Sequence, residues 1–193
     1  MVTATFTPTN TLTQTPSNTP TPTFTPTITF TSTPTVSSPY LLTFIANADS
    51  YVNQGSVNAN YGTNTQLWAD GDAGANYESY LQFSVSGITG TVQSAILRVY
   101  STSGTVGGPI VYAAANGWTE TGVTWNTRPA LTSSALDTIT KIKTKAWIEY
   151  NVTVQITGDG TYSFALIPTS TDGVSFSARE GSQPPQLVLT IAP

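Results

Sequence analysis

The sequence has no cysteine, no histidine and very little charge. It therefore offers no disulfide framework, no Cys/His metal site and no imidazole general base. Charged residues make up 8% of the 193 residues, the net charge is −4, and every charged residue lies at or after Asp49. Nucleic acid is therefore not an expected partner, and enzymes that pair a Cys or His nucleophile with a base are excluded.

Long apolar runs are also missing. No segment has the length that a membrane-spanning helix needs, so we expect no membrane span. The chain starts without the basic and apolar regions of an export signal, which we expect to have been removed or omitted. A long Thr/Pro tract without Lys or Arg, joined to a Gly/Asn/Thr-rich region, is typical of an extracellular or cell-surface protein.

The first 39 residues form a Thr/Pro-rich tail with a period of two. Thr or Ser occupies every odd position from Thr3 to Thr35, and the prolines between these two residues all lie at even positions. A period of two predicts an extended strand, since polyproline II repeats every three residues. Proline has no backbone N–H, so the missing hydrogen-bond donors all fall along one edge of such a strand, and the other edge can pair with another strand. The tail is either a docking strand or a solvated, O-glycosylated spacer.

Under the docking interpretation, Thr27 to Thr33 is the main docking strand because it contains no proline. Val2–Thr7 and Thr9–Thr15 are predicted as secondary strands, and Pro16–Pro26 as extended but poorly paired. Thr3–Val36 would reach about 110 Å if fully extended, whereas a domain of this size is about 40 Å across. Order throughout the tail would thus require neighbouring copies. The candidate docking residues are Ile28, Phe30, Phe24, Leu12 and Phe6.

Residues 40–193 are predicted to form an all-β domain, a two-sheet antiparallel β-sandwich of the jelly-roll type. Short runs with alternating apolar residues are separated by clusters of Gly, Asn, Asp and Pro, without a helical period. A shift of register by one residue would bury Arg98, so the alternation also predicts which residues form the core. These are Leu81, Phe83, Ala95, Leu97, Val99, Leu187 and Leu189.

The order of short motifs along the domain resembles a known family. The motifs are ADSYV at 48–52, NYG at 60–62, LW at 67–68, YLQF at 80–83, SAILRVY at 94–100, WTE at 118–120, VTWN at 123–126, NVT at 151–153 and FSARE at 176–180. They resemble the DNRLRE-type domain, also classed as carbohydrate-binding module family 96 and similar to the disaggregatase-related repeat. The resemblance implies a β-jelly-roll, a secreted or cell-surface setting and, for some members, binding of acidic polysaccharides such as alginate. Asn151 departs from the expected Asp.

Sugar binding needs aromatic platforms, because the apolar face of a pyranose packs on a ring while its hydroxyls meet polar groups. Trp68 and Tyr77, followed by Tyr61, are the candidates, since they lie near segments rich in Asn, Asp and Gly. Trp118 and Trp125 belong to the motifs of the resemblance, and we interpret them as core residues.

Lys141, Lys143 and Lys145 alternate with uncharged residues. A strand here would place three ammonium groups on one face, about 7 Å apart. Such a row either binds an acidic polysaccharide, in which case binding falls as salt rises, or protects a sheet edge from aggregation.

Asp70 and Asp72, with Glu78 nearby, are candidates for a structural Ca²⁺ site, although a DGD segment is also an ordinary turn. No other cofactor is expected. No pair of carboxylates is marked as acid and base, so we predict no catalytic residue and no enzyme. The residues interpreted as a source of structural ion pairs are Arg98, Glu120, Arg179 and Glu180.

Two functions follow from these observations. Our main hypothesis is a non-catalytic subunit of an extracellular filament or surface assembly, in which the tail adds as a strand to other copies and its Thr face carries O-linked glycans. The alternative is a carbohydrate-binding module for an acidic polysaccharide, tethered by a glycosylated Thr/Pro linker to a larger secreted protein.

Overall fold

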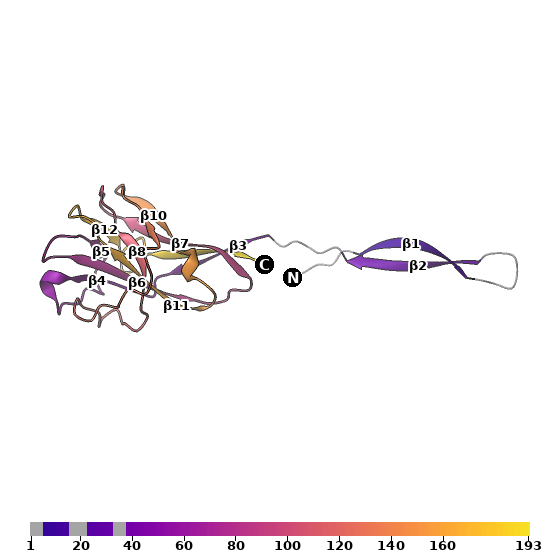
Figure 1. Cartoon of the computed structure of the whole chain (residues 1–193), viewed down its shortest axis with the longest axis horizontal. Coiled ribbons are helices and arrows are strands. Elements are labelled where there is room, and N and C mark those ends of the chain that lie inside the picture. The colour runs from indigo at the N-terminus through magenta and orange to yellow at the C-terminus, as the bar shows by residue number, and fades with distance from the viewer. Residues whose placement is uncertain (1–5, 16–22, 33–37) are drawn as a thin grey trace. The chain divides into compact units, whose positions relative to one another are not determined.

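The computed structural model describes residues 6–15, 23–32 and 38–193. They belong to two compact units, Met1–Ser38 and Pro39–Pro193 (Figure 1). In the described part of the chain, no helix is long and apolar enough to cross a membrane.

The first unit contains a β-hairpin. β1 (Phe6–Thr15) pairs with β2 (Thr23–Ser32) in an antiparallel ladder (Figure 1). Odd-numbered residues face each other across the ladder, which gives five Thr–Thr pairs from Thr7 and Thr31 to Thr15 and Thr23. Pro8 and Pro26 fall at even-numbered positions. Because proline cannot donate a hydrogen bond, these positions suit the pairs that are not hydrogen-bonded across the ladder. Both strands are extended, as the period of two predicts.

The hairpin gives the predicted docking strand a partner in its own chain. Ile28 and Phe30 lie opposite Asn10 and Pro8. Residues 23–26 are paired as well, so the prediction of poor pairing is wrong for them. Residues 6–15 and 23–32 pair within one chain, so their order does not by itself require neighbouring copies. Docking on other copies stays a prediction; residues 2–5, 16–22 and 33 lie outside the described residues. The candidate docking residues Phe6, Leu12, Phe24, Ile28 and Phe30 all lie in β1 and β2.

The second unit is a sandwich of two antiparallel sheets, as predicted (Figure 1). The first sheet contains β3 (Tyr40–Ile45), β13 (Gln186–Ala192), β7 (Thr91–Ser101), β12 (Val174–Ser177) and β5 (Gln66–Ala69) in this order, and β10 (Ala146–Asn151) also pairs with β7. The second sheet contains β4 (Ala48–Asn53), β6 (Tyr77–Val85), β11 (Gly160–Ile167), β8 (Ile110–Ala114) and β9 (Asp137–Thr138). Two short 3₁₀ helices are η1 (Gln54–Ser56) and η2 (Thr153–Gln155).

The predicted core is confirmed. The seven predicted residues have no exposed surface, because alternate side chains of each sheet face the other sheet. In β7, for example, Leu97 is buried while its neighbour Arg98 is half-exposed. A second apolar cluster covers the other side of β6, around Tyr80 and Trp118. Trp118 is buried in this cluster and Trp125 packs against it, which agrees with their interpretation as core residues.

Deletion of residues 1–38 is expected to leave the sandwich folded, because the apolar clusters found among the described residues contain only residues from Tyr40 onward. The melting temperature of residues 39–193 should equal that of the whole chain within about 2 °C. Calorimetry on the two proteins checks this expectation. A clear fall in melting temperature on deletion would show that the tail supports the sandwich and that the division of the chain at residue 39 is wrong.

Candidate functional site

Four aromatic side chains form a continuous row where β4, β5 and the start of β6 lie together. Tyr61 stacks on Tyr51, with ring centroids 4.3 Å apart and planes 15° apart. Tyr77 follows with its ring centroid 5.8 Å from that of Tyr51, and the Trp68 ring lies 6.5 Å from that of Tyr77. We call these four residues the aromatic row.

The local sequence explains how the row forms. Leu67 and Ala69 are buried, so the alternation in β5 turns Trp68 outward, where 37% of it is exposed. Asp70 and Tyr77 then exchange two backbone hydrogen bonds of 3.1 and 2.8 Å. The six residues between them close a loop that contains Gly74 with a φ of +78°, a conformation that favours glycine. This closure holds Tyr77 beside Trp68.

A hollow of about 500 Å³ lies next to the aromatic row. It is lined by Tyr51, Trp68, Tyr77, Asp70, Asp72 and Ala75, and we call it the aromatic hollow. Oδ1 of Asp70 is buried and has no hydrogen-bond partner among the described residues. Burial raises the pKa of the Asp70 carboxyl, and the charge of Asp72 raises it further. Asp72, which also lines the hollow, is exposed and its carboxylate oxygens can accept hydrogen bonds from a ligand donor such as a sugar hydroxyl.

The structure thus brings together most of the candidate site residues. Trp68, Tyr77, Asp70 and Asp72 line the hollow, and Tyr61 extends the row. The sequence reasoning missed Tyr51, which lies between Tyr61 and Tyr77 in the row. Its only sequence signal was its place in the ADSYV motif.

Glu78 lies apart from Asp70 and Asp72. It accepts a hydrogen bond of 2.7 Å from the Tyr80 hydroxyl and forms an ion pair of 3.1 Å with Arg128. The Arg128 guanidinium lies 3.9 Å from the centroid of the Trp125 ring. These groups adjoin another hollow, of about 340 Å³. Because an arginine already balances Glu78, we interpret it as structural; Ca²⁺ binding at the other two carboxylates stays a prediction.

The prediction of a lysine-bearing strand at Lys141–Lys145 is wrong. Only Ile142 makes a β-bridge, with Thr105, and its side chain is buried. Lys145 has a φ of +58° and its N–H donates to the Ser101 carbonyl, so the chain turns here before it enters β10. The three lysines are exposed, and none lines the aromatic hollow. The ion pairs found among the described residues involve arginines only.

Three carboxylates gather around Arg179. Single oxygen atoms of Asp49, Glu120 and Glu180 lie within 4.8 Å of one another. Arg179 donates to both carboxylate oxygens of Glu120, at 3.0 and 2.7 Å, and lies 2.6 Å from Glu180. Its backbone N–H donates to Asp49, whose own N–H donates to Glu120. We call these residues the Arg179 cluster.

The Arg179 cluster is structural rather than a cation site, because the guanidinium already supplies the positive charge. It connects β4 of the second sheet to the segment that follows β12 of the first sheet. Asp49 is buried, and desolvation raises its pKa to about 7. The predicted ion pairs are confirmed here, and Arg98 forms another, of 2.9 Å, with Glu149.

Comparison with known proteins identifies one family for the sandwich. Residues 40–191 match the family described as carbohydrate-binding module family 96. No curated protein matches the chain. The match begins at the first strand of the sandwich, ends within its last strand and covers more than half of the chain. The chain therefore belongs to carbohydrate-binding module family 96.

Proposed function

We propose that the sandwich is a non-catalytic module that binds polysaccharide in the aromatic hollow. The observation that carries this proposal is the aromatic row beside a hollow that two carboxylate side chains, Asp70 and Asp72, also line. Sugar rings would pack on Trp68 and Tyr77, whose rings meet at 48° and so present differently inclined faces. Asp70 and Asp72 would accept hydrogen bonds from the hydroxyls at the rim of the sugar.

The charge of the hollow favours an uncharged stretch of polysaccharide. Two carboxylates line the hollow and no basic side chain does. A uronate or sulfate bound there would lie close to like charges, which costs free energy in a partly desolvated site. The hypothesis of an acidic ligand assumed that the lysines and Trp68 share one site, and the lining of the hollow does not support that assumption.

Family membership favours the module over the filament subunit. The pairing of β1 with β2 also removes the argument that an ordered tail requires other copies. In this function the Thr/Pro tail is a spacer that carries O-linked glycans on its threonines and connects the module to a larger secreted or surface protein. The two functions differ in one direct observable, which is assembly: the module should stay monomeric at concentrations at which a filament subunit assembles.

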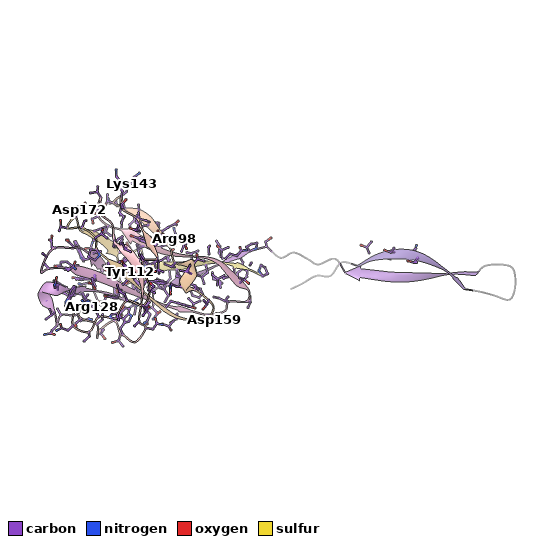
Figure 2. All side chains as sticks on the ribbon, in the orientation of Figure 1. Arg98, Tyr112, Arg128, Lys143, Asp159 and Asp172 are labelled. Carbon is purple, nitrogen blue, oxygen red and sulfur yellow. The ribbon has the colours of Figure 1, made fainter. Side chains whose placement is uncertain are left out.

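Trp68→Ala is expected to weaken polysaccharide binding about tenfold, because it removes one stacking platform. The measurement is affinity electrophoresis in native gels that contain galactomannan, xylan or β-glucan, followed by calorimetric titration with oligosaccharides of the polymer that binds. Tyr77→Ala should have a similar effect. Tyr112→Ala is the matched control, since this half-exposed tyrosine, labelled in Figure 2, lies on β8 and does not line the hollow.

Two results would contradict the proposal. Unchanged binding of an uncharged polysaccharide by both Trp68→Ala and Tyr77→Ala would exclude the aromatic hollow as its site. The absence of any retardation of the wild-type protein by every polysaccharide in the panel, charged or uncharged, would argue against the function itself.

A further inference from the structure

The motif Asn151-Val152-Thr153 has no part in the proposed function. Asn151 stands where the resemblance leads one to expect aspartate, and Thr153 follows two positions later. Asn-x-Ser/Thr, with any residue except proline in the middle, is the acceptor motif for N-linked glycans. Asn151 is the only asparagine of the sequence that is followed two positions later by Ser or Thr. A motif of three residues is common by chance in a Thr-rich chain, so its place in the fold decides whether it can be modified.

The motif lies on the surface at the end of β10, which is labelled in Figure 1. Asn151 is the last residue of this strand, opposite Ile96 of β7, and Thr153 is the first residue of η2. Asn151 is exposed, whereas Val152 is buried and anchors the segment in the core. The residue after the motif, Val154, is 78% exposed. Among the described residues, therefore, nothing covers the outer side of this turn.

Hydrogen bonds hold the Asn151 side chain by its oxygen. The backbone N–H and the hydroxyl of Thr153 both donate to Oδ1 of Asn151, at 3.0 and 2.7 Å. Because a backbone N–H can only donate, the atom that it meets must be the amide oxygen. The Thr153 hydroxyl also accepts a hydrogen bond of 2.9 Å from the N–H of Ala95 on β7, which fixes its position. In the described part of the chain no acceptor is found for Nδ2 of Asn151, so the amide nitrogen is the free end of the side chain.

The fold itself does not need this nitrogen. An aspartate would serve the turn as well, because only the oxygen accepts from Thr153. An aspartate would also bring a second carboxylate close to Asp137, whose Oδ2 accepts from the backbone N–H of Asn151 at 2.7 Å. An amide avoids that repulsion. This explains an uncharged residue at position 151, yet it leaves the exposed nitrogen without a role.

We propose that Asn151 is the attachment site of an N-linked glycan. The donor is an oligosaccharide carried on a polyprenyl pyrophosphate, and a glycosyltransferase catalyses the transfer. The bond between Nδ2 and the anomeric carbon forms, and the bond between that carbon and the pyrophosphate oxygen breaks. The carrier leaves with the electron pair of the broken bond, and Nδ2 loses one proton. The proposal goes beyond polysaccharide binding and requires only that the chain be exported.

A glycan at this position leaves the aromatic hollow open. The residues that line the hollow belong to β4, β5, β6 and the segment between β5 and β6, and none belongs to β10 or η2. β12, the neighbour of β5, meets β7 at Ser101, whereas Asn151 meets it at Ile96, about 17 Å further along the strand. The protein should therefore bind polysaccharide equally well with and without the glycan.

The test is secretion of the whole chain from yeast behind a cleavable signal, followed by mass spectrometry of the tryptic peptide 146–179. Trypsin cleaves after Lys145 and Arg179, and Asn151 is the only asparagine between them. We expect the peptide to carry one oligosaccharide. Peptide N-glycosidase, which hydrolyses the bond between glycan and asparagine, should remove it and leave aspartate. O-linked glycans on the tail resist this enzyme and lie on a different peptide.

Two variants form a matched pair. Asn151→Asp is expected to abolish the modification while it keeps the oxygen that accepts from Thr153. Thr153→Ser keeps the hydroxyl and should be modified like the wild type. The circular dichroism spectrum of secreted Asn151→Asp should equal that of the wild type after glycosidase treatment, which shows that a lost glycan does not reflect a misfolded chain.

Three results would overturn the proposal. An unmodified peptide 146–179 from the secreted wild-type protein would exclude the site. A sugar that persists on this peptide in Asn151→Asp would be attached to a hydroxyl and not to the amide. A glycan found only on protein that is retained in the cell would show that the modification is incompatible with the fold. None of these measurements depends on polysaccharide binding, so the site is tested separately from the proposed function.

Discussion

Asp49→Asn is expected to change the pH dependence of stability by roughly 3–4 kcal/mol between about pH 4 and pH 8. Burial raises the pKa of Asp49 from 3.8 to about 7, with smaller contributions from the charges of Glu180 and Glu120. At a pH between these two pKa values, the folded protein keeps a proton on Asp49 that the unfolded chain has lost. The wild-type protein therefore loses stability as the pH rises from about 4 to about 7. In this range the unfolded chain releases the Asp49 proton freely, whereas the folded protein must retain the proton or ionise a buried carboxyl.

Asparagine at this position cannot ionise and still offers an oxygen to the backbone N–H of Arg179, the group that donates 2.7 Å to Asp49. The variant should become more stable relative to the wild type as the pH rises. The measurement is the free energy of unfolding in urea at several pH values.

Asp159→Asn is the control, because the pKa of Asp159 is shifted in the opposite direction to that of Asp49. Hydrogen bonds from the backbone N–H groups of Ile88 and Gly87 lower the pKa of this fully exposed carboxyl. Its stabilising effect is present above the usual pKa of aspartate and is lost as the pH falls, so its removal should matter least at low pH. Parallel pH profiles for wild type and Asp49→Asn would contradict the assigned pKa.

Arg128→Met is expected to lower the free energy of unfolding by about 2–3 kcal/mol, because it leaves the carboxylate of Glu78 without its counter-charge. Only 12% of the Glu78 side chain is exposed, against 36% for Arg128, and this partial exposure lowers the expected cost. The Tyr80 hydroxyl would remain as a donor to Glu78. Urea unfolding measures the loss.

Arg98→Met provides a matched control, since this arginine also contacts a tryptophan ring and pairs with a glutamate. Its partner Glu149 has 57% of its side chain exposed, so the loss should be within about 1 kcal/mol. Glu78→Gln in the Arg128→Met background should recover much of the stability, because it removes the unbalanced charge. Equal losses in the two arginine variants would show that burial of the glutamate does not set the cost.

The sequence by itself determined the strands and the core of the sandwich. Alternation of buried and exposed residues is a local property with a period of two, so the residue pattern alone assigns Leu97 and Arg98 in β7 to opposite faces. The same period predicted extended strands in the tail. The sequence also predicted Trp68 and Tyr77 as candidate sugar-binding platforms, because they are aromatic residues that flank an Asp- and Gly-rich segment.

Only the tertiary structure decided which groups meet. A period of two does not name the partner of a strand, and in the tail β2 pairs with β1 of its own chain. The alternation of Lys141–Lys145 looks like a strand, yet the backbone bonds of Ile142 with Thr105 and of Lys145 with Ser101 make the chain turn. Tyr51 reaches Tyr61 and Tyr77, and Trp147 reaches Tyr100, through pairing and packing between segments far apart in the chain. Such contacts depend on register and sheet order, which are long-range properties, and so the aromatic row became visible only in the folded chain.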